Sequence, residues 1–232
     1  MPYRRLPKTD VARLKALQTV IGNDDLYTVK KRVIDWKVMN QCQPAYDKLY
    51  TAIEQCRIMR AALRRAAIKQ EKMQKKAAMY VGHFLQVFSM AMERGEIKEK
   101  YREQYGLETE GRFHGLLRDR ETFVALGRQV IEAEKDRIKK GGFPIYNPSI
   151  GKVATHFDVF VAAMQECQAR EEQVDMAVRK VQEQRVEADG VIEELWNQIE
   201  AFYAQEPPEV RFDKCRQLGI IYYYRRHEEH LY

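Results

Sequence analysis

The densest group of side chains with binding chemistry in this sequence is a run of cations. Between positions 57 and 76 the chain carries one acid, Glu71, and eight cations. These are Arg57, Arg60, Arg64, Arg65, Lys69, Lys72, Lys75 and Lys76. At 100° per residue they cover one half of a helix. A row of cations at this pitch can follow a phosphate backbone, so it is the candidate nucleic-acid-binding site.

Other uses of this basic face stay open. The favoured one is a solvated face, or one that pairs with acids of another helix. No recognised nucleic-acid-binding fold accompanies the cations, although Tyr222, Tyr223 and Tyr224 offer rings for base stacking. An acidic protein is a further possible partner. A membrane surface is least favoured, because the opposite helix face is needed for the core.

Residues with catalytic or metal-binding chemistry are isolated. There is no glycine-rich phosphate-binding motif, and neither Ser89 nor Ser149 lies in a GxSxG motif. No histidine follows an acid by three positions, as di-metal helical bundles require. We therefore predict no catalytic, cofactor-binding or metal-binding residue, and we lean towards a protein that is not an enzyme.

Three pairs of titratable residues have spacings that only weakly suggest a metal-binding or catalytic site. Glu110 and His114 are interpreted as a surface pair, and Asp158 beside His156 as an acid favoured by a helix start. His227 and His230 flank two glutamates near the chain end, where adventitious metal binding is expected. The thiols of Cys56 and Cys167 are expected to be small buried apolar groups.

These residues must be positioned by helices. Apolar residues recur every three or four positions over 45–92 and 152–205, which predicts two long amphipathic helices. Pro44 is expected at the start of the first, and Pro207 and Pro208 end the second. Shorter helices are expected over 9–21, with a further one over 26–39, and over 96–105, 117–140 and 208–217. Continuity through Gly82 and Gly190 stays open.

A shift of 111 residues aligns the two long helices, for example Cys56 with Cys167 and Ala77 with Ala188. This indicates a tandem duplication. We predict an all-α fold, an elongated bundle of long antiparallel helices built from two tandem helical repeats. A single domain would span 1–232, with repeat one at about 9–107, a linker at about 108–116, repeat two at about 117–220 and a tail at 221–232.

The stretch KKGGFPIYNPSI, residues 139–150, is predicted to be a joint between helices rather than a binding loop. Gly141 and Gly142 are expected to stop one helix, and Asn147 to cap the next with Pro148 at its first position. Phe143, Ile145 and Tyr146 are expected to pack against the end of the bundle. Further on, GIIYYY has strand propensity but no evident strand to pair with.

Charge and cysteine usage point to a reduced compartment and a charged partner. Residues 1–110 carry 22 cations and 13 acids, a net +9, and residues 111–232 carry 18 and 21, a net −3. The four cysteines form no CxxC pair, and no apolar run has the 18–20 residues or so that span a bilayer. The opening segment has no apolar core of a signal peptide. We predict a cytoplasmic protein without a membrane partner.

The segments PYRRLPKTD, GGFPIYNPSI and LGIIYYYR (218–225) resemble those of a family of uncharacterised bacterial proteins. Its members look like tandem helical hairpins with a GG-x-PI-x-NP linker and a C-terminal YG-[VI]-[VI]-Y motif. The resemblance covers nearly the whole chain. Leu218 stands where an aromatic residue is expected, and repeat one lacks the linker motif. The resemblance implies a helical-bundle fold and carries no activity or site residue.

The predicted function is therefore a non-catalytic cytoplasmic interaction or structural protein of helical-bundle type. A protein partner or self-association is expected. The alternative is sequence-independent nucleic-acid binding, to RNA above all, through the basic face of residues 57–76.

Overall fold

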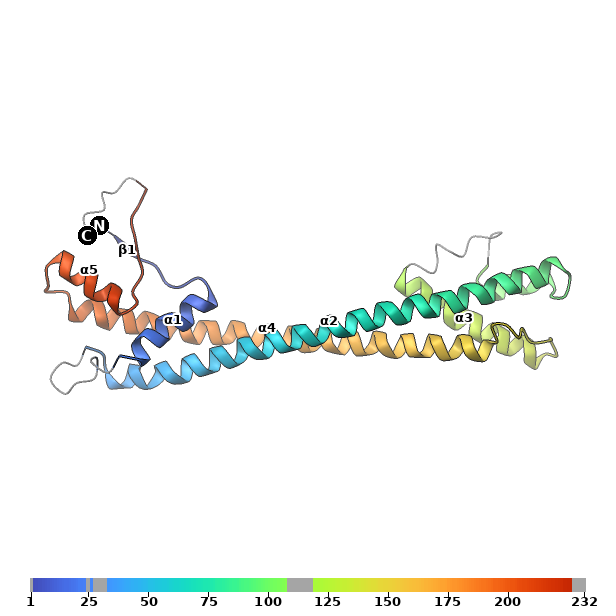
Figure 1. Ribbon diagram of the computed structural model, residues 1–232, viewed down its shortest axis with the longest axis horizontal. Helices are drawn as coiled ribbons and strands as arrows, with labels where there is room; N and C mark the ends of the chain where they lie inside the picture. The colour runs from blue at the N-terminus through green and yellow to red at the C-terminus, as the bar shows by residue number, and fades with distance from the viewer. Residues whose placement is uncertain (1, 24–25, 27–32, 108–118, 227–232) are drawn as a thin grey trace. The chain divides into compact units, whose positions relative to one another are not determined.

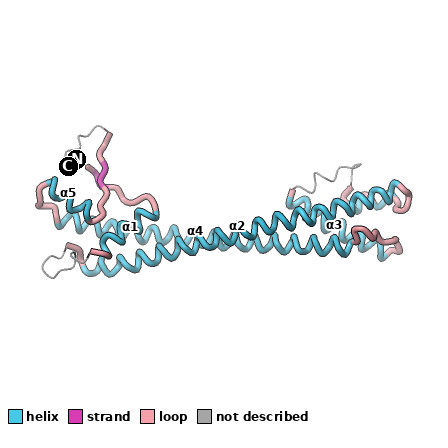
Figure 2. Tube along the Cα trace, viewed as in Figure 1, coloured by secondary structure: helices cyan, strands magenta, loops and turns pink. Residues whose placement is uncertain are grey.

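The computed structural model describes residues 2–23, 26, 33–107 and 119–226, and in this part of the chain the fold is all-α (Figure 1). The helices are α1 (Asp10–Ile21), α2 (Trp36–Glu93), α3 (Arg120–Lys139), α4 (Ile150–Phe202) and α5 (Pro208–Gln217). Two 3₁₀ turns, η2 (Glu99–Tyr101) and η3 (Glu103–Tyr105), stand where a short helix over 96–105 was predicted. Two short strands, β1 (Tyr3–Arg4) and β2 (Tyr222–Tyr223), complete the elements (Figure 2).

The helix α2 starts earlier than its sequence predicts. The amides of Val38 and Met39 donate to the carbonyl of Asp35, so the first turn forms there, and Pro44 lies inside the helix. The prediction that Pro44 starts the helix, and that a separate helix ends at residue 39, is wrong. Pro44 removes one helical hydrogen bond at an exposed position, while buried Val38 and Cys42 hold the turns before it. Both long helices continue through Gly82 and Gly190.

Contacts divide the chain into two compact units. Unit 1 comprises Met1–Arg60 and Gln173–Tyr232, and unit 2 comprises Ala61–Glu172. Each unit therefore takes residues from both predicted repeats, because α2 and α4 each contribute to both units. The single-domain boundaries given above stay a prediction.

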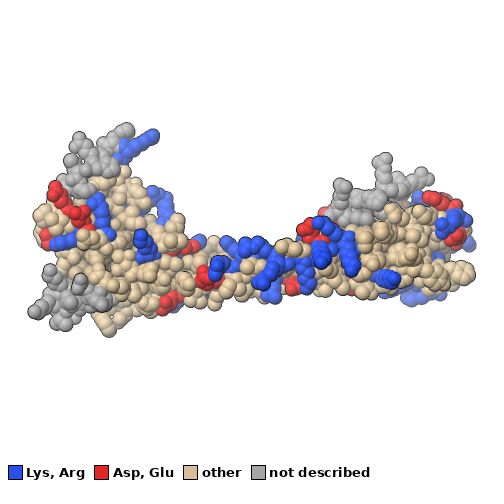
Figure 3. Space-filling view, in the orientation of Figure 1, with Lys and Arg blue, Asp and Glu red and all other residues tan. Residues whose placement is uncertain are grey.

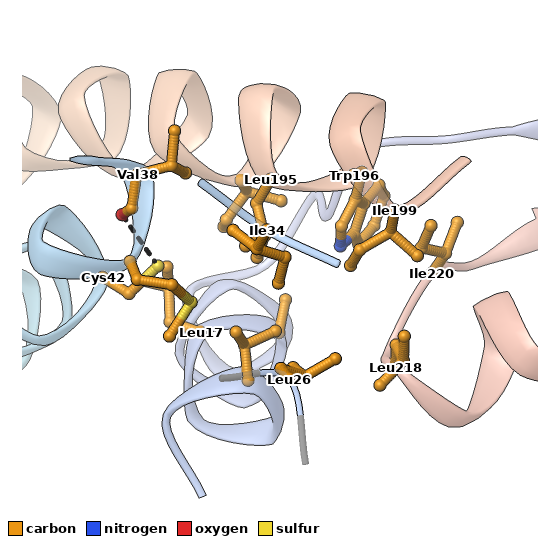
Figure 4. Close-up of a cluster of buried hydrophobic side chains, with 14 of the residues drawn as sticks. Leu17, Leu26, Ile34, Val38, Cys42, Leu195, Trp196, Ile199, Leu218 and Ile220 are labelled. Atoms are coloured by element: carbon orange, nitrogen blue, oxygen red, sulfur yellow. Dashed lines mark hydrogen bonds between the residues drawn. The ribbon is translucent and has the colours of Figure 1, made fainter. Parts of the chain in front are cut away.

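The core of unit 1 joins α1 to α2 and α4. Leu17, Leu49 and Trp196 are fully buried, and Trp196 lies beside Ile199 and Ile220 (Figure 4). The Cys42 thiol donates to the carbonyl of Val38 at 3.4 Å within this cluster (Figure 4).

Two bidentate ion pairs fasten α1 to α4 at the edge of this core. Arg13 binds Asp189 at 2.7 and 2.8 Å, and Arg185 binds Asp10 at 2.7 Å through both nitrogens. The hydrogen bonds from Arg185 lower the pKa of Asp10, so the pair stays charged below the usual range of an aspartate. Thr9 caps α1 as an N-cap residue, since its side chain accepts from the amide of Ala12.

The tail after residue 218 does find a strand to pair with, contrary to the sequence prediction. Tyr3 pairs with Tyr223 and Arg4 with Tyr222 in an antiparallel register. The Tyr222 hydroxyl donates to Glu200 at 2.6 Å, and Arg4 donates to the same carboxylate at 2.9 Å. The partner strand comes from the other end of the chain, so no local pattern indicates it.

Unit 2 has an aromatic core. Phe123 of α3 packs against Phe157 and Phe160 of α4, with ring centroids 5.9 and 5.3 Å apart. Gly127 lets α3 approach α4 closely, because a Cβ atom there would lie 2.1 Å from the Phe157 ring. The helix pairing of unit 2 thus depends on a residue without a side chain.

The linker after α3 matches its prediction only in part. Gly141 adopts a left-handed φ of 88°, and the amides of Gly141 and Gly142 close the helix end, as expected. Ser149, not Asn147, caps α4, since its hydroxyl accepts from Lys152 and its carbonyl from Val153.

Candidate interaction surface

The basic face of α2 lies on the solvent side of the helix. All eight cations from Arg57 to Lys76 are exposed, while Cys56, Ala66, Gln70 and Ala77 on the opposite side are buried. Arg57 and Arg60 belong to unit 1 and the other six to unit 2. Figure 3 shows Lys and Arg side chains gathered over the paired helices α2 and α4. This arrangement leaves all eight cations open to solvent.

Three of the eight cations are occupied by acids. Arg57 pairs with Glu54 at 2.7 Å and Lys75 with Glu71 at 2.6 Å, both along α2. Lys69 reaches across to Glu166 of α4 at 2.8 Å. The remaining five form no ion pair with any residue that the structure describes; they are Arg60, Arg64, Arg65, Lys72 and Lys76. The predicted intramolecular neutralisation of this face is therefore incomplete.

Apolar side chains interrupt the cations on the same face. Ile68 is 69% exposed and Met79 is 46% exposed. Ile68 is four residues from both Arg64 and Lys72, so it shares their side of the helix. Ile68 therefore gives this face an apolar contact point between cations.

The exposed side of α4 in unit 2 carries the opposite charge. Asp158, Glu166, Glu171 and Glu172 are exposed there, together with Ala162 and Ala169. Unit 2 thus presents one basic and one acidic helix.

A pocket of about 530 Å³ lies between α2, α3 and α4 of unit 2. Gln70, the polar exception in the apolar stripe, is buried and accepts from Arg120 at 3.0 and 3.2 Å when its amide oxygen points towards α3. Burial and the neighbouring Glu171 carboxylate raise the pKa of the Cys167 thiol in this pocket. A thiol held protonated is a poor nucleophile, so the pocket carries no activated cysteine.

The remaining titratable residues with spacing signals form no site among the described residues. His156 stacks on Tyr80 with ring centroids 4.1 Å apart, and Asp158 points to solvent. Glu110, His114, His227 and His230 lie outside the described residues. Elsewhere, in the described part, no three His, Cys, Asp or Glu side chains gather in a group that could hold a metal ion. No helix among the described residues is long and apolar enough for a bilayer.

Sequence reasoning missed a buried polar network that holds the 139–150 linker. Arg137 binds Glu134 at 2.8 and 2.9 Å, and the Tyr105 hydroxyl donates to Glu134 at 2.6 Å. Arg137 also donates to the carbonyl of Phe143, and the amide of Ile145 donates to Glu134. The only local sign of this network in the sequence is the spacing of Glu134 and Arg137, which lie three residues apart shortly before Gly141 and Gly142.

This network orients the linker side chains. Ile145 is buried, as predicted, but Phe143 is 89% exposed and Tyr146 is 80% exposed. The prediction that both aromatic rings pack against the bundle is wrong, because the network fixes the backbone of the linker with these rings pointing to solvent.

Comparisons of the chain with protein-family models, with curated proteins and with solved structures find no match. What the chain does must therefore be argued from its own surfaces.

Proposed function

We propose that this protein is a non-catalytic interaction or structural protein of the cytoplasm, which binds a protein partner through the exposed face of α2. One observation carries the proposal: Ile68 is exposed between Arg64 and Lys72 on a helix whose opposite side already serves the core, and Met79 is exposed just beyond the last cation. Such a face binds best to a surface that combines acids with small apolar groups. The four cysteines are free and buried, which fits a reduced compartment.

A duplicated helical architecture would supply this face. At a shift of 111 residues, buried positions of α2 fall on buried positions of α4. The pairs are Leu49 and Phe160, Ala52 and Ala163, Cys56 and Cys167, Ala77 and Ala188, Val81 and Ile192, Phe84 and Leu195, Leu85 and Trp196, and Phe88 and Ile199. We infer from this agreement that the chain arose by tandem duplication of a helical unit into an elongated bundle.

The test is site-specific photo-cross-linking in cells that make the protein naturally. A photoreactive amino acid replaces Ile68, and in a matched control it replaces Val11 of α1, which is 77% exposed. We expect a discrete adduct heavier than the 27.4 kDa chain from position 68 and none from position 11. Absence of any adduct at position 68, or the same adducts from both positions, would overturn the proposal.

A second candidate function is sequence-independent binding of RNA or DNA by the same cations. The specific support is the five cations that lack an ion pair with a described residue. Each phosphate contact would add a slope of about −0.9 to log affinity against log salt on duplex DNA.

Binding of labelled RNA and duplex DNA across a salt series tests this alternative. Charge reversal at Arg60, Arg64, Lys69 and Lys72 to Glu should abolish binding and leave helicity intact. Flat or absent binding near physiological salt would reject it and leave a protein partner.

A further inference from the structure

The proposed interaction function leaves the partner unidentified, and unit 2 offers a way to identify it. Five exposed residues of α2 recur at alternating steps of three and four, which places them in one stripe. This α2 stripe consists of Arg65, Ile68, Lys72, Lys75 and Met79. It is basic with two apolar side chains and continues no part of the core.

A second stripe with the same spacing runs along α4 in the same unit. This α4 stripe consists of Asp158, Ala162, Gln165, Ala169 and Glu172, and all five are exposed. Acids stand at both ends and small alanines between them. The spacing of the two stripes is that of the contact positions in paired helices.

The two stripes are chemically complementary. In either direction along α4, the order of residues is acid, Ala, Gln, Ala, acid. Arg65 and Ile68 would therefore meet an acid and an alanine whether the two helices pair parallel or antiparallel. Lys72, Lys75 and Met79 would meet Gln165, an alanine and the second acid, so the two stripes are complementary in net charge. The alanines leave room for the branched side chain of Ile68, which is 69% exposed.

Lys75 of the α2 stripe pairs with Glu71 of its own helix at 2.6 Å, but most charges of the two stripes are not used within one chain. Lys69 and Glu166 are paired at 2.8 Å, so α2 and α4 lie side by side in unit 2. Arg65, Lys72, Asp158 and Glu172 make no ion pair with any residue that the structure describes. The opposite charges thus remain exposed on one helix pair, available to a second one.

We propose that the partner is a second copy of this chain, and that unit 2 forms a two-fold dimer with the α2 stripe of each copy on the α4 stripe of the other. This inference rests on the proposed interaction function. In such a dimer each copy uses both of its stripes at once, so neither stripe is left open and the assembly ends at two copies. Since few apolar groups are buried, the contact depends on charge and weakens with salt.

Sedimentation equilibrium of the purified full chain measures this association directly. We expect a monomer–dimer equilibrium at about 0.05 M salt that moves at least tenfold towards monomer at about 0.5 M, because screening shortens the reach of the charges.

Two charge-reversal variants make the test specific. The first carries Arg65→Glu, Lys72→Glu and Lys75→Glu, and the second carries Asp158→Lys and Glu172→Lys. Each alone should be monomeric, with dissociation constants raised about a hundredfold or more by like charges. Mixed in equal amounts, they should form a heterodimer, since each reversed stripe then meets its complement. The variant Lys8→Glu, Lys15→Glu and Lys37→Glu changes net charge as much as the first and should dimerise normally.

The outcomes separate the two proposals. Monomeric wild-type protein at low salt, or a mixture that stays monomeric although both variants keep wild-type circular dichroism, would overturn the dimer. A cross-linked adduct at position 68 whose mass is not twice that of the chain would then leave the interaction function standing with a different protein partner. An adduct of twice the mass together with the heterodimer supports both.

Discussion

At the scale of single residues, the fold buries a pair of opposite charges, Glu134 and Arg137, at a cost in desolvation. Their side chains are 0% and 5% exposed, and Tyr105 and the linker backbone add further hydrogen bonds. A buried pair contributes little over apolar residues, but removing one partner leaves a charge stranded away from water. The network therefore fixes the linker more than it stabilises the protein, and it exposes Phe143 and Tyr146.

We predict that Glu134→Leu lowers the free energy of unfolding by about 3–5 kcal/mol, because Arg137 loses its buried partner. Asp136→Asn is the matched control: it removes the exposed partner of Lys139 in the same helix and should change stability by less than about 0.5 kcal/mol. Urea unfolding measures both. Equal effects would mean that the Glu134 network is not closed to water.

Because the Cys42 thiol is buried, we predict that the free energy of unfolding falls at alkaline pH. Burial raises the pKa of its thiol from 9.0 to about 11. The unfolded chain thus releases this proton first, so the contribution of Cys42 to stability is complete below pH 9 and falls towards pH 11, by at most about 1.4 kcal/mol per pH unit. Urea midpoints of the wild type and Cys42→Ala across this range check it. The variant should decline less steeply, and parallel curves would refute the assignment to Cys42.

At the scale of elements, two helical glycines have opposite effects on stability. Gly127 of α3 faces the Phe157 ring, whereas around Gly190 of α4 no atom lies within 4 Å of an added Cβ. Inside a helix, glycine itself costs about 1 kcal/mol relative to alanine. Of these two, Gly127 has a packing reason, since it brings α3 onto α4.

Gly127→Ala should therefore destabilise the protein by about 1–3 kcal/mol through overpacking, and Gly190→Ala should stabilise it by about 0.5–1 kcal/mol. Thermal unfolding of the two variants gives opposite shifts of the midpoint. If the midpoint of Gly127→Ala also rose, the close contact of α3 with Phe157 would be wrong.

At the scale of the whole molecule, two compact units share two helices that run without a break through both. Each unit has its own hydrophobic cluster. Neither long helix is complete within one unit, since each contributes buried residues to both clusters. If one unit unfolded alone, the parts of α2 and α4 in that unit would lose the core that they pack against.

We therefore expect a single cooperative unfolding transition, in keeping with the prediction of one domain. Trp196 is fully buried in unit 1 and reports on that cluster by fluorescence, while far-ultraviolet circular dichroism reports helices of both units. The two curves should coincide in urea. A fluorescence change that precedes the loss of helix would divide the chain into two domains.

The sequence by itself determined the helical class, the ends of α1, the C-terminal end of α3, the stop at Gly141 and the solvent side of the eight cations. These follow from periodicity and local chain geometry, which neighbouring residues set. Only the tertiary structure decided that Pro44 lies inside α2, that Tyr222 and Tyr223 pair with β1, and that Glu134 is buried. Those features depend on contacts between residues far apart in the chain, and no local pattern carries them.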